Sequence, residues 1–185
     1  MPIGSFTVVP YIARELVHRQ PARVLDLGMG AGFLGAVVRQ WLDLGVRPWR
    51  TRLVGVEAWA DYRNPLWDLY DLVVVDRIEN YLTGFQDQFD MVLLGDVLEH
   101  MEIPEGMLLL SQVRIRVAAG GMLIVATPAE FFDQGAAYGN ELERHRSLWS
   151  DGHLESLGFR IILSGREQQV AITPTILAYW THGGG

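Results

Sequence analysis

The chain has 185 residues, of which 49% are hydrophobic, and it can bury one sizeable core without disulfides. It has no Cys, and its 15 Lys and Arg residues are all Arg, which excludes thiolate metal sites, cysteine nucleophiles and a Schiff-base lysine. The formal net charge of −7 has the wrong sign for neutralising nucleic-acid phosphates, so we expect no nucleic-acid partner.

No apolar run approaches the roughly 18 residues of a membrane span, and the N-terminus lacks the basic start and apolar core of a signal peptide. We therefore expect a cytoplasmic protein with no membrane partner. The sequence predicts one domain over residues 1–182, followed by a tail of three glycines at 183–185.

The first elements alternate between helix and strand. Apolar residues at helical spacing predict an N-terminal helix within residues 1–20, over Phe6 to Arg19, packed against the domain. The next expected elements are a strand Arg23–Leu27, a helix Phe33–Leu44, a strand Arg50–Val56, a short helix Pro65–Leu69 and the strands Leu72–Val75 and Phe89–Leu94. A helix Pro104–Ala118 and a strand Met122–Ala126 follow, separated by a glycine pair. This order predicts an α/β domain with a mostly parallel sheet.

The alternation breaks at residues 127–149, a polar and aromatic stretch that is too long for an ordinary connection and reads as an insertion. Ser150 is then a candidate N-cap for a helix that reaches Leu157. Two strands are expected to close the domain, Phe159–Ser164 and Ala171–Trp180.

Four acids fall at or near the ends of four successive predicted strands: Asp26, Glu57, Asp76 and Asp96. In an open α/β sheet the carboxyl ends of the strands form the ligand-binding edge. Each acid alone could cap a helix, but four in phase favour a binding site. Glu57 suits a ribose, because a carboxylate accepts hydrogen bonds from two neighbouring hydroxyls.

The glycines after the first strand have two interpretations. Gly30-x-Gly32-x-x-Gly35 satisfies the dinucleotide pattern, which alone is weak evidence for NAD(P). Asp26 points the other way, because it stands two residues before Gly28-x-Gly30-x-Gly32 and its anion would repel a diphosphate. A cationic ligand such as the methionine end of S-adenosylmethionine is therefore favoured.

The segment Val24-Leu25-Asp26-Leu27-Gly28-Met29-Gly30-Ala31-Gly32 resembles the first motif of the class I S-adenosylmethionine-dependent methyltransferases. Further motifs follow in that family's order: Glu57, Asp76, Phe89-Asp90-Met91-Val92, Gly95-Asp96-Val97-Leu98-Glu99-His100 and Gly120-Gly121-Met122-Leu123-Ile124. The segment Gly95–His100 contains D-V-L-E-H, which is common in the small-molecule branch. The resemblance covers roughly Val24 to Gly158.

The resemblance implies a Rossmann-like, doubly wound, seven-stranded sheet with an antiparallel last strand and helices on both faces. It also implies a cofactor site made of Asp26, Gly28, Gly30, Gly32, Glu57, Asp76, Arg77, Asp96 and Val97. In that site the glycines approach the methionine moiety, Glu57 holds the ribose hydroxyls, Asp76 and Arg77 lie at the adenine edge, and Asp96 and Val97 lie near the sulfonium. Asp76-Arg77-Ile78 departs from the small residues usual there, so Arg77 could instead be a solvated neighbour.

Methyl transfer from a sulfonium needs alignment and exclusion of water more than a nucleophilic triad, and no triad is visible. A hydroxyl acceptor would be helped by a base, for which His145, His100 and His153 are candidates, with Asp96 beside them near the sulfonium. His100 could instead orient its loop, and His153 could lie on the surface. For His145, neighbouring Arg144 and Arg146 would depress the pKa, or they could bind an acidic acceptor.

The acceptor itself is not readable from the sequence. Phe131, Phe132, Tyr138 and Trp149 could line its pocket or anchor the insertion as core residues. The Asn/Asp-Pro-Pro-aromatic stretch of base-modifying enzymes is absent, which argues for a small molecule. No cluster has convincing metal-ligand spacing, so no metal is predicted, although a catechol-type metal site is not excluded.

The hypothesis is O-methylation of a small molecule by S-adenosylmethionine. Its rivals are an NAD(P)-dependent oxidoreductase and a non-catalytic cofactor-binding partner subunit. The oligomeric state stays open, a homo-oligomer included.

Overall fold

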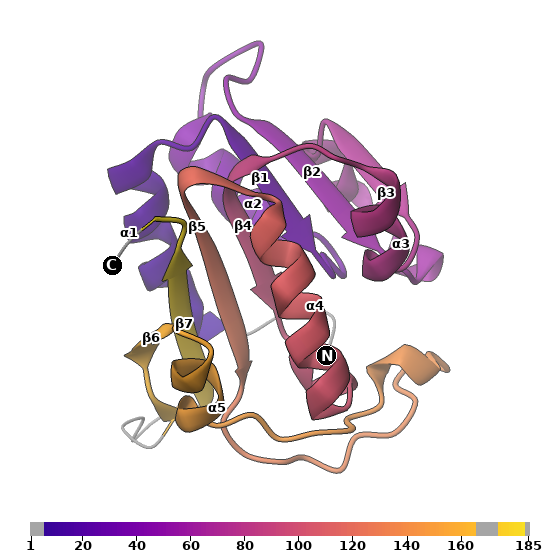
Figure 1. Ribbon diagram of the computed structural model, residues 1–185. Helices are drawn as coiled ribbons and strands as arrows, with labels where there is room; N and C mark the ends of the chain where they lie inside the picture. Colours follow the sequence, from indigo (N-terminus) through magenta and orange to yellow (C-terminus); the bar gives the residue numbers. More distant parts are fainter. Residues whose placement is uncertain (1–5, 166–173, 184–185) are drawn as a thin grey trace.

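The computed structural model describes residues 6–165 and 174–183. The strands within these ranges form one seven-stranded sheet in the order β3-β2-β1-β4-β5-β7-β6 (Figure 1). Their bounds are β1 Arg23–Leu27, β2 Arg52–Glu57, β3 Leu72–Val75, β4 Phe89–Gly95, β5 Val117–Pro128, β6 Arg160–Leu163 and β7 Thr175–Thr181. β7 is antiparallel to both neighbours, and the other neighbouring pairs are parallel. The predicted Rossmann-like, doubly wound fold with an antiparallel last strand is confirmed.

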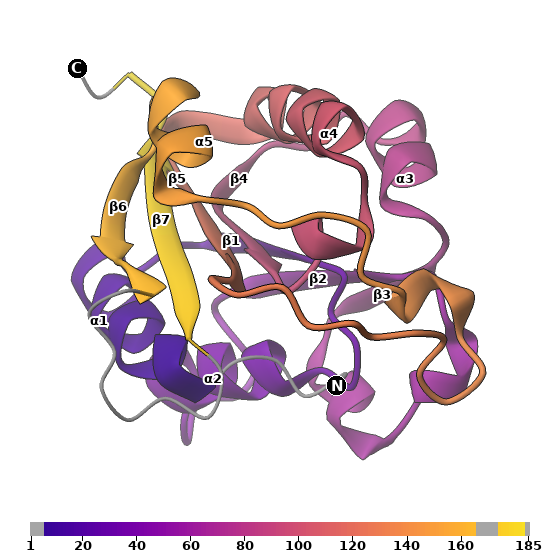
Figure 2. The same cartoon turned by 90° about the horizontal axis from the view of Figure 1, so that it is seen from below.

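Helices cover both faces of the sheet (Figure 2). One face carries α1 Val9–Arg19 and α2 Phe33–Leu42, and the other carries α3 Ile78–Gly84, α4 Ile103–Ile115 and α5 Asp151–Ser156. Short 3-10 turns lie between them: η1 Phe6–Val8, η2 Ala60–Tyr62, η3 Pro65–Leu69, η4 Leu98–His100 and η5 Glu141–Glu143. Among the described helices, none is both long and apolar enough to cross a bilayer.

The central strand β4 shows why these strands are almost continuously apolar. Met91 and Leu93 pack into the core beneath α1 and α2, whereas Val92 and Leu94 pack into the core beneath α4. Successive side chains of a strand point to opposite faces, so a sheet covered on both sides needs apolar residues at every position.

Most expected elements lie close to their predicted bounds, and β1, β3 and η3 match them. The fifth strand is the main exception, because β5 begins at Val117 rather than at Met122. Val117 pairs with Phe89, and the register then shifts before Met91 pairs with Met122. The pairing of Val117 with β4 draws this residue into the sheet, and α4 accordingly ends at Ile115.

Two other differences concern α3 and the last strand. α3 was not expected from the sequence; it follows Asp76, whose carboxylate accepts hydrogen bonds from the Arg77 amide and the Asn80 side chain. The last strand was predicted from Ala171, but residues 171–173 lie outside the described residues, and β7 begins at Thr175.

The strand order places the site. β2 and β3 are added to the sheet on one side of β1, whereas β4 and β5 are added on the other, so the strand order reverses beside β1. Ligands of open α/β sheets bind at the carboxyl ends of the strands next to such a switch point. The insertion was predicted over residues 127–149, but Thr127 and Pro128 still belong to β5. After Pro128 the chain passes across this edge of the sheet and returns to α5 (Figures 1 and 2). It therefore covers the edge at which the sequence places the four acids.

Candidate functional site

A cavity of about 890 Å³ opens at the carboxyl ends of β1, β2 and β4. Its volume lies within the range of small-molecule and cofactor pockets. Nine of the predicted site residues line it: Asp26, Gly28, Gly30, Glu57, Arg77, Asp96, Val97, His100 and His145. Gly32 and Asp76 are not among its lining residues. The structure thus brings seven of the nine predicted cofactor residues and two of the predicted bases to one cavity.

The glycine turn after β1 requires glycine at its first position. Gly28 has a φ of +70°, and a Cβ there would lie 2.5 Å from Cγ2 of Val97. Gly32, with a φ of +87°, is the N-cap residue of α2. Gly28 therefore allows the close approach of β1 and the β4 loop at the cavity, whereas Gly32 shapes the turn behind it.

Glu57 is held at the end of β2 by two backbone amides. Its Oε2 accepts from Gly30 N at 2.9 Å and its Oε1 from Trp59 N at 2.8 Å. The side chain is buried, and this burial raises its pKa. Each carboxylate oxygen has a further lone pair, so both oxygens can accept from a ligand's hydroxyl groups.

Asp26 is the most deeply placed acid of the cavity, with 1% of its surface exposed. Burial raises its pKa from 3.8 to about 7, even though the Tyr70 hydroxyl donates to Oδ2 at 2.6 Å and so lowers it. Tyr70 itself accepts from the amide of Gly35 at 3.0 Å. A cationic ligand group beside Asp26 would favour its charged form.

The two predicted residues at the end of β3 lie in different surroundings. The Asp76 carboxylate is engaged at the start of α3, as described above, and does not line the cavity. Arg77 lines the cavity beside Ile78 and Glu79, and its guanidinium lies 3.3 Å from Glu79. Arg77 thus lies at the cavity wall, while Asp76 serves the helix terminus.

The residues after β4 combine an unusual backbone with a buried acid. Asp96 has a φ of +52°, in the left-handed region, and side chains other than glycine are uncommon there and cluster at functional sites. Glu99 is 3% exposed, and its Oε2 accepts from the Thr127 hydroxyl at 3.0 Å. Burial, followed by the charge of Asp96, raises the pKa of Glu99 well above its usual value.

Several hydrogen bonds fix the insertion over the cavity. The amides of Arg146 and Ser147 both donate to Glu99 O, at 2.7 and 3.1 Å. At the opposite wall the Tyr62 hydroxyl donates to Glu143 at 2.7 Å. The insertion is therefore tied both to the β4 loop and to η2.

This path brings His145 next to His100, with ring centroids 5.1 Å apart. Burial is the main cause that lowers the pKa of each histidine. For His145 the expected direction is right, but the expected cause is wrong, because Arg144 pairs with Glu141 instead.

The other predicted candidates separate into different roles. His153 is exposed and caps α5 together with Ser150, which agrees with its surface interpretation. Trp149 is 1% exposed and belongs to the core, and a Cβ on Gly106 would lie 2.5 Å from its ring. Phe132 lines the cavity, while Phe131 and Tyr138 are exposed and do not.

Sequence reasoning missed several residues that complete the site. Tyr70, Tyr62, Glu143 and Thr127 contact predicted residues or close the cavity, but each comes from an element remote in sequence. No local pattern marks them. The one sequence signal for an acid at this end of the cavity was the adjacency of Glu99 to His100, because it places a carboxylate and an imidazole in one short turn.

No protein-family model matches the sequence, and no curated protein matches it. Solved structures match its fold. An O-methyltransferase family protein from Burkholderia thailandensis has a TM-score of 0.65 at 15% identity, over 96% of this chain and 56% of that one. The chain thus spans little more than half of that relative's length.

In two further solved structures, the match with this chain covers a larger share of the other protein. The 1,6-didemethyltoxoflavin-N1-methyltransferase of B. thailandensis, with its substrate and S-adenosylhomocysteine bound, has a TM-score of 0.65 at 16% identity, over 95% of this chain and 79% of that one. An S-adenosylmethionine-dependent methyltransferase from Archaeoglobus fulgidus has a TM-score of 0.57 at 17% identity, over 93% of this chain and 94% of that one. At these identities the likeness establishes a shared fold.

Proposed function

We propose that this chain is an S-adenosylmethionine-dependent methyltransferase that methylates a hydroxyl group of a small molecule. One observation carries the proposal: a single cavity has the carboxylates of Asp26 and Glu57 in its wall together with the imidazoles of His100 and His145. The carboxylates suit a cofactor with an amino group and ribose hydroxyls, and the imidazoles suit an acceptor that must lose a proton. The methyltransferase structures that share the fold support this class.

The cofactor roles follow from the charges and hydrogen bonds of the cavity. Asp26 receives the ammonium group, and Glu57 accepts from the two ribose hydroxyls. Gly28 and Gly30 leave room for the methionine chain. Arg77 and the buried Ile78 contact the adenine, and Asp96 and Val97 lie beside the sulfonium. Gly32 and Asp76, which do not line the cavity, support the turn and α3.

The glycine turn also argues against the rival dinucleotide. A diphosphate binds such turns through free backbone N–H groups. Here the amide of Gly30 donates to Glu57, that of Gly32 to Met29 O and that of Gly35 to the Tyr70 hydroxyl. The N–H groups of the three glycines that satisfy the dinucleotide pattern are thus already hydrogen-bonded within the protein.

The protein accelerates methyl transfer mainly by positioning. The acceptor oxygen attacks the methyl carbon in line with the departing sulfur, and alignment of the reacting groups supplies most of the advantage. The insertion covers the acceptor end of the cavity and excludes water. His145 or His100 accepts the hydroxyl proton at Nε2, since burial keeps both rings neutral.

An oxygen acceptor is favoured over nitrogen or carbon because the cavity contains these neutral bases. The fold itself does not decide, since its relatives include an O-methyltransferase family protein and an N1-methyltransferase. The acidic composition supports a small-molecule acceptor rather than nucleic acid, and a cytoplasmic location stays a prediction from the sequence.

Calorimetry with S-adenosylhomocysteine and with NADH tests the cofactor. We expect S-adenosylhomocysteine to bind, and Glu57→Ala to weaken it by roughly 1–3 kcal/mol, because the ribose hydroxyls lose their acceptors. Glu155→Gln is the control, since Glu155 is an exposed acid on α5 outside the cavity. Binding of NADH without S-adenosylhomocysteine would refute the proposal.

Turnover tests the base. Release of S-adenosylhomocysteine is measured with a panel of small phenols and alcohols, and the acceptor that gives the highest rate is kept. His145→Ala should lower kcat at least tenfold while leaving the affinity for S-adenosylhomocysteine within twofold of wild type. A fully active variant would remove His145 from the reaction.

A further inference from the structure

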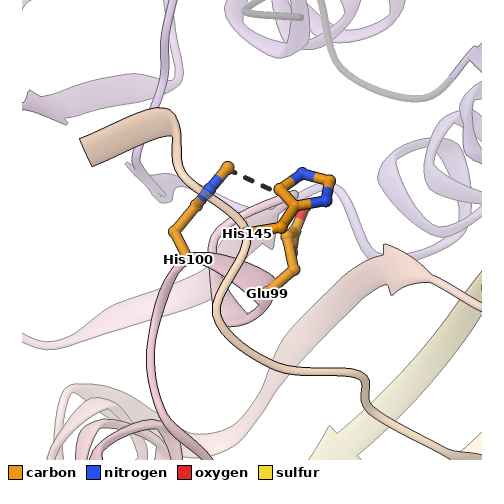
Figure 3. A group of neighbouring side chains, drawn as sticks. All are labelled: Glu99, His100 and His145. Carbon is orange, nitrogen blue, oxygen red and sulfur yellow. Dashed lines mark ion pairs between the residues drawn. The ribbon is translucent and has the colours of Figure 1, made fainter. Parts of the chain in front are cut away.

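Three potential metal ligands meet at the end of the cavity beneath the insertion. Glu99 and His100 come from η4 and His145 from the insertion, and one ligand atom from each lies within 4.8 Å of the other two. Figure 3 shows the three side chains gathered at one point. We call this group the His–Glu cluster.

Both imidazoles of the cluster are held in the orientation that metal-binding histidines adopt. Nδ1 of His145 lies 2.9 Å from Phe132 O, and Nδ1 of His100 lies 3.3 Å from Arg144 O. A carbonyl oxygen only accepts, so each neutral ring carries its proton on Nδ1 and keeps the lone pair of Nε2. A backbone carbonyl on the far nitrogen is the usual outer-shell partner of a metal-bound histidine.

Glu99 supplies a buried carboxylate whose one ion-pair partner in the described part of the chain is the neighbouring His100. Its Oε2 accepts from Thr127, while its Oε1 lies 4.0 Å from His100 Nε2, which is beyond hydrogen-bond distance. Among the ion pairs of residues 6–165 and 174–183, none joins an arginine side chain to the Glu99 carboxylate. Burial of an anion without a counter-charge is costly.

We infer that the His–Glu cluster binds a first-row divalent transition-metal ion. Two imidazole nitrogens and one carboxylate oxygen form a donor set that suits Zn²⁺, Fe²⁺ or Co²⁺, and it suits Mg²⁺ poorly because Mg²⁺ prefers oxygen ligands. The ion would offset the charge of the buried Glu99 carboxylate. Three protein ligands leave coordination positions open toward the cavity.

A catalytic role for this ion rests on the proposed function, although binding of the ion does not. An acceptor hydroxyl at an open position would lose its proton to solvent more readily. The oxygen–methyl bond then forms as the methyl–sulfur bond breaks, which yields the methyl ether, S-adenosylhomocysteine and one proton. In the metal-loaded protein His100 and His145 would act as ligands, because the ion occupies both Nε2 lone pairs. This role replaces the base role given above, which applies to the metal-free protein, and the proton then goes to solvent.

Cobalt titration of protein dialysed against a chelator tests the site. We expect one Co²⁺ per chain, seen as visible absorption bands, displaced by Zn²⁺ but not by millimolar Mg²⁺. Glu99→Gln, His100→Asn and His145→Asn should each weaken binding at least tenfold. His18→Asn, which changes an exposed histidine near the end of α1, should leave it unchanged. Wild-type binding no tighter than that of the cluster variants would overturn the inference.

A second measurement needs no variant, in case a substitution unfolds the chain. Proton NMR of the Co²⁺-loaded wild type should show two strongly shifted exchangeable signals, from the Nδ1–H groups of His100 and His145. Bound Co²⁺ without these two signals would overturn the inference. Calorimetry with S-adenosylhomocysteine in the presence of chelator separates the metal site from the proposed function. Binding of S-adenosylhomocysteine without binding of Co²⁺ would refute only the metal site. Binding of Co²⁺ without binding of S-adenosylhomocysteine would refute only the proposed function.

Discussion

Asp26→Asn should make the unliganded protein more stable and cofactor binding weaker. The substitution keeps the shape of the side chain and an oxygen that can accept from the Tyr70 hydroxyl, but it removes the charge. Because Asp26 is buried at the cavity, the charge opposes folding while it favours a cationic ligand.

The size of the stability effect follows from the pKa. Burial raises the pKa of Asp26 from 3.8 to about 7, so the folded protein binds the proton more tightly than the unfolded chain does. The wild type therefore loses stability as the pH rises from about 4 to about 7, and the loss is constant above that range. At 1.36 kcal/mol per pH unit, the loss of folding free energy over this range amounts to about 4 kcal/mol. This is an upper limit for the stability that Asp26→Asn gains, because the buried amide of the variant also needs hydrogen-bond partners.

Urea unfolding of both proteins at pH 5, 6, 7 and 8 measures this difference. The variant's advantage should grow steadily from pH 5 to pH 7 and then level off. Calorimetry at pH 8 should show S-adenosylhomocysteine binding weakened roughly 10- to 100-fold, the size of one lost charge-assisted hydrogen bond. A stability difference independent of pH would refute the buried anion, and unchanged affinity would refute its contact with the amino group.

Three further substitutions test the glycine turn at the cavity and the contacts that anchor the insertion. Gly28→Ala should lower both stability and cofactor affinity, because its Cβ would lie 2.5 Å from Val97 at a φ of +70°. Urea unfolding measures the loss of stability and calorimetry the loss of affinity. A variant that is unchanged in both would contradict the close approach of Gly28 to Val97. Trp149→Ala should cost about 3–5 kcal/mol in urea unfolding, since it empties a fully buried indole site, and a cost below about 1 kcal/mol would show that the insertion is not anchored there. Tyr62→Phe should speed hydrogen exchange within residues 129–146 several-fold while leaving β1 and β4 protected, because it removes the bond to Glu143, and unchanged exchange would show that this bond does not hold the insertion.

The sequence by itself determined the frame of the molecule. The apolar run Arg23–Leu27 followed by glycines predicts a buried strand, a tight turn and a helix, since each of these depends on neighbours within a few residues. The acids Asp26 and Glu57 could be placed at one edge because parallel strands align their carboxyl ends. The irregular path of residues 127–149 was also predictable, from their polarity and length.

Only the tertiary structure decided which distant side chains meet. Tyr70 reaches Asp26 across 44 positions of the chain, and His145 lies beside His100 because the insertion folds back over the sheet edge. The pKa values of Asp26 and Glu99 depend on burial, which local sequence does not specify. The sequence places two members of the His–Glu cluster, Glu99 and His100, side by side. It does not place His145 with them, because His145 comes from a loop whose path is set by contacts rather than by periodicity.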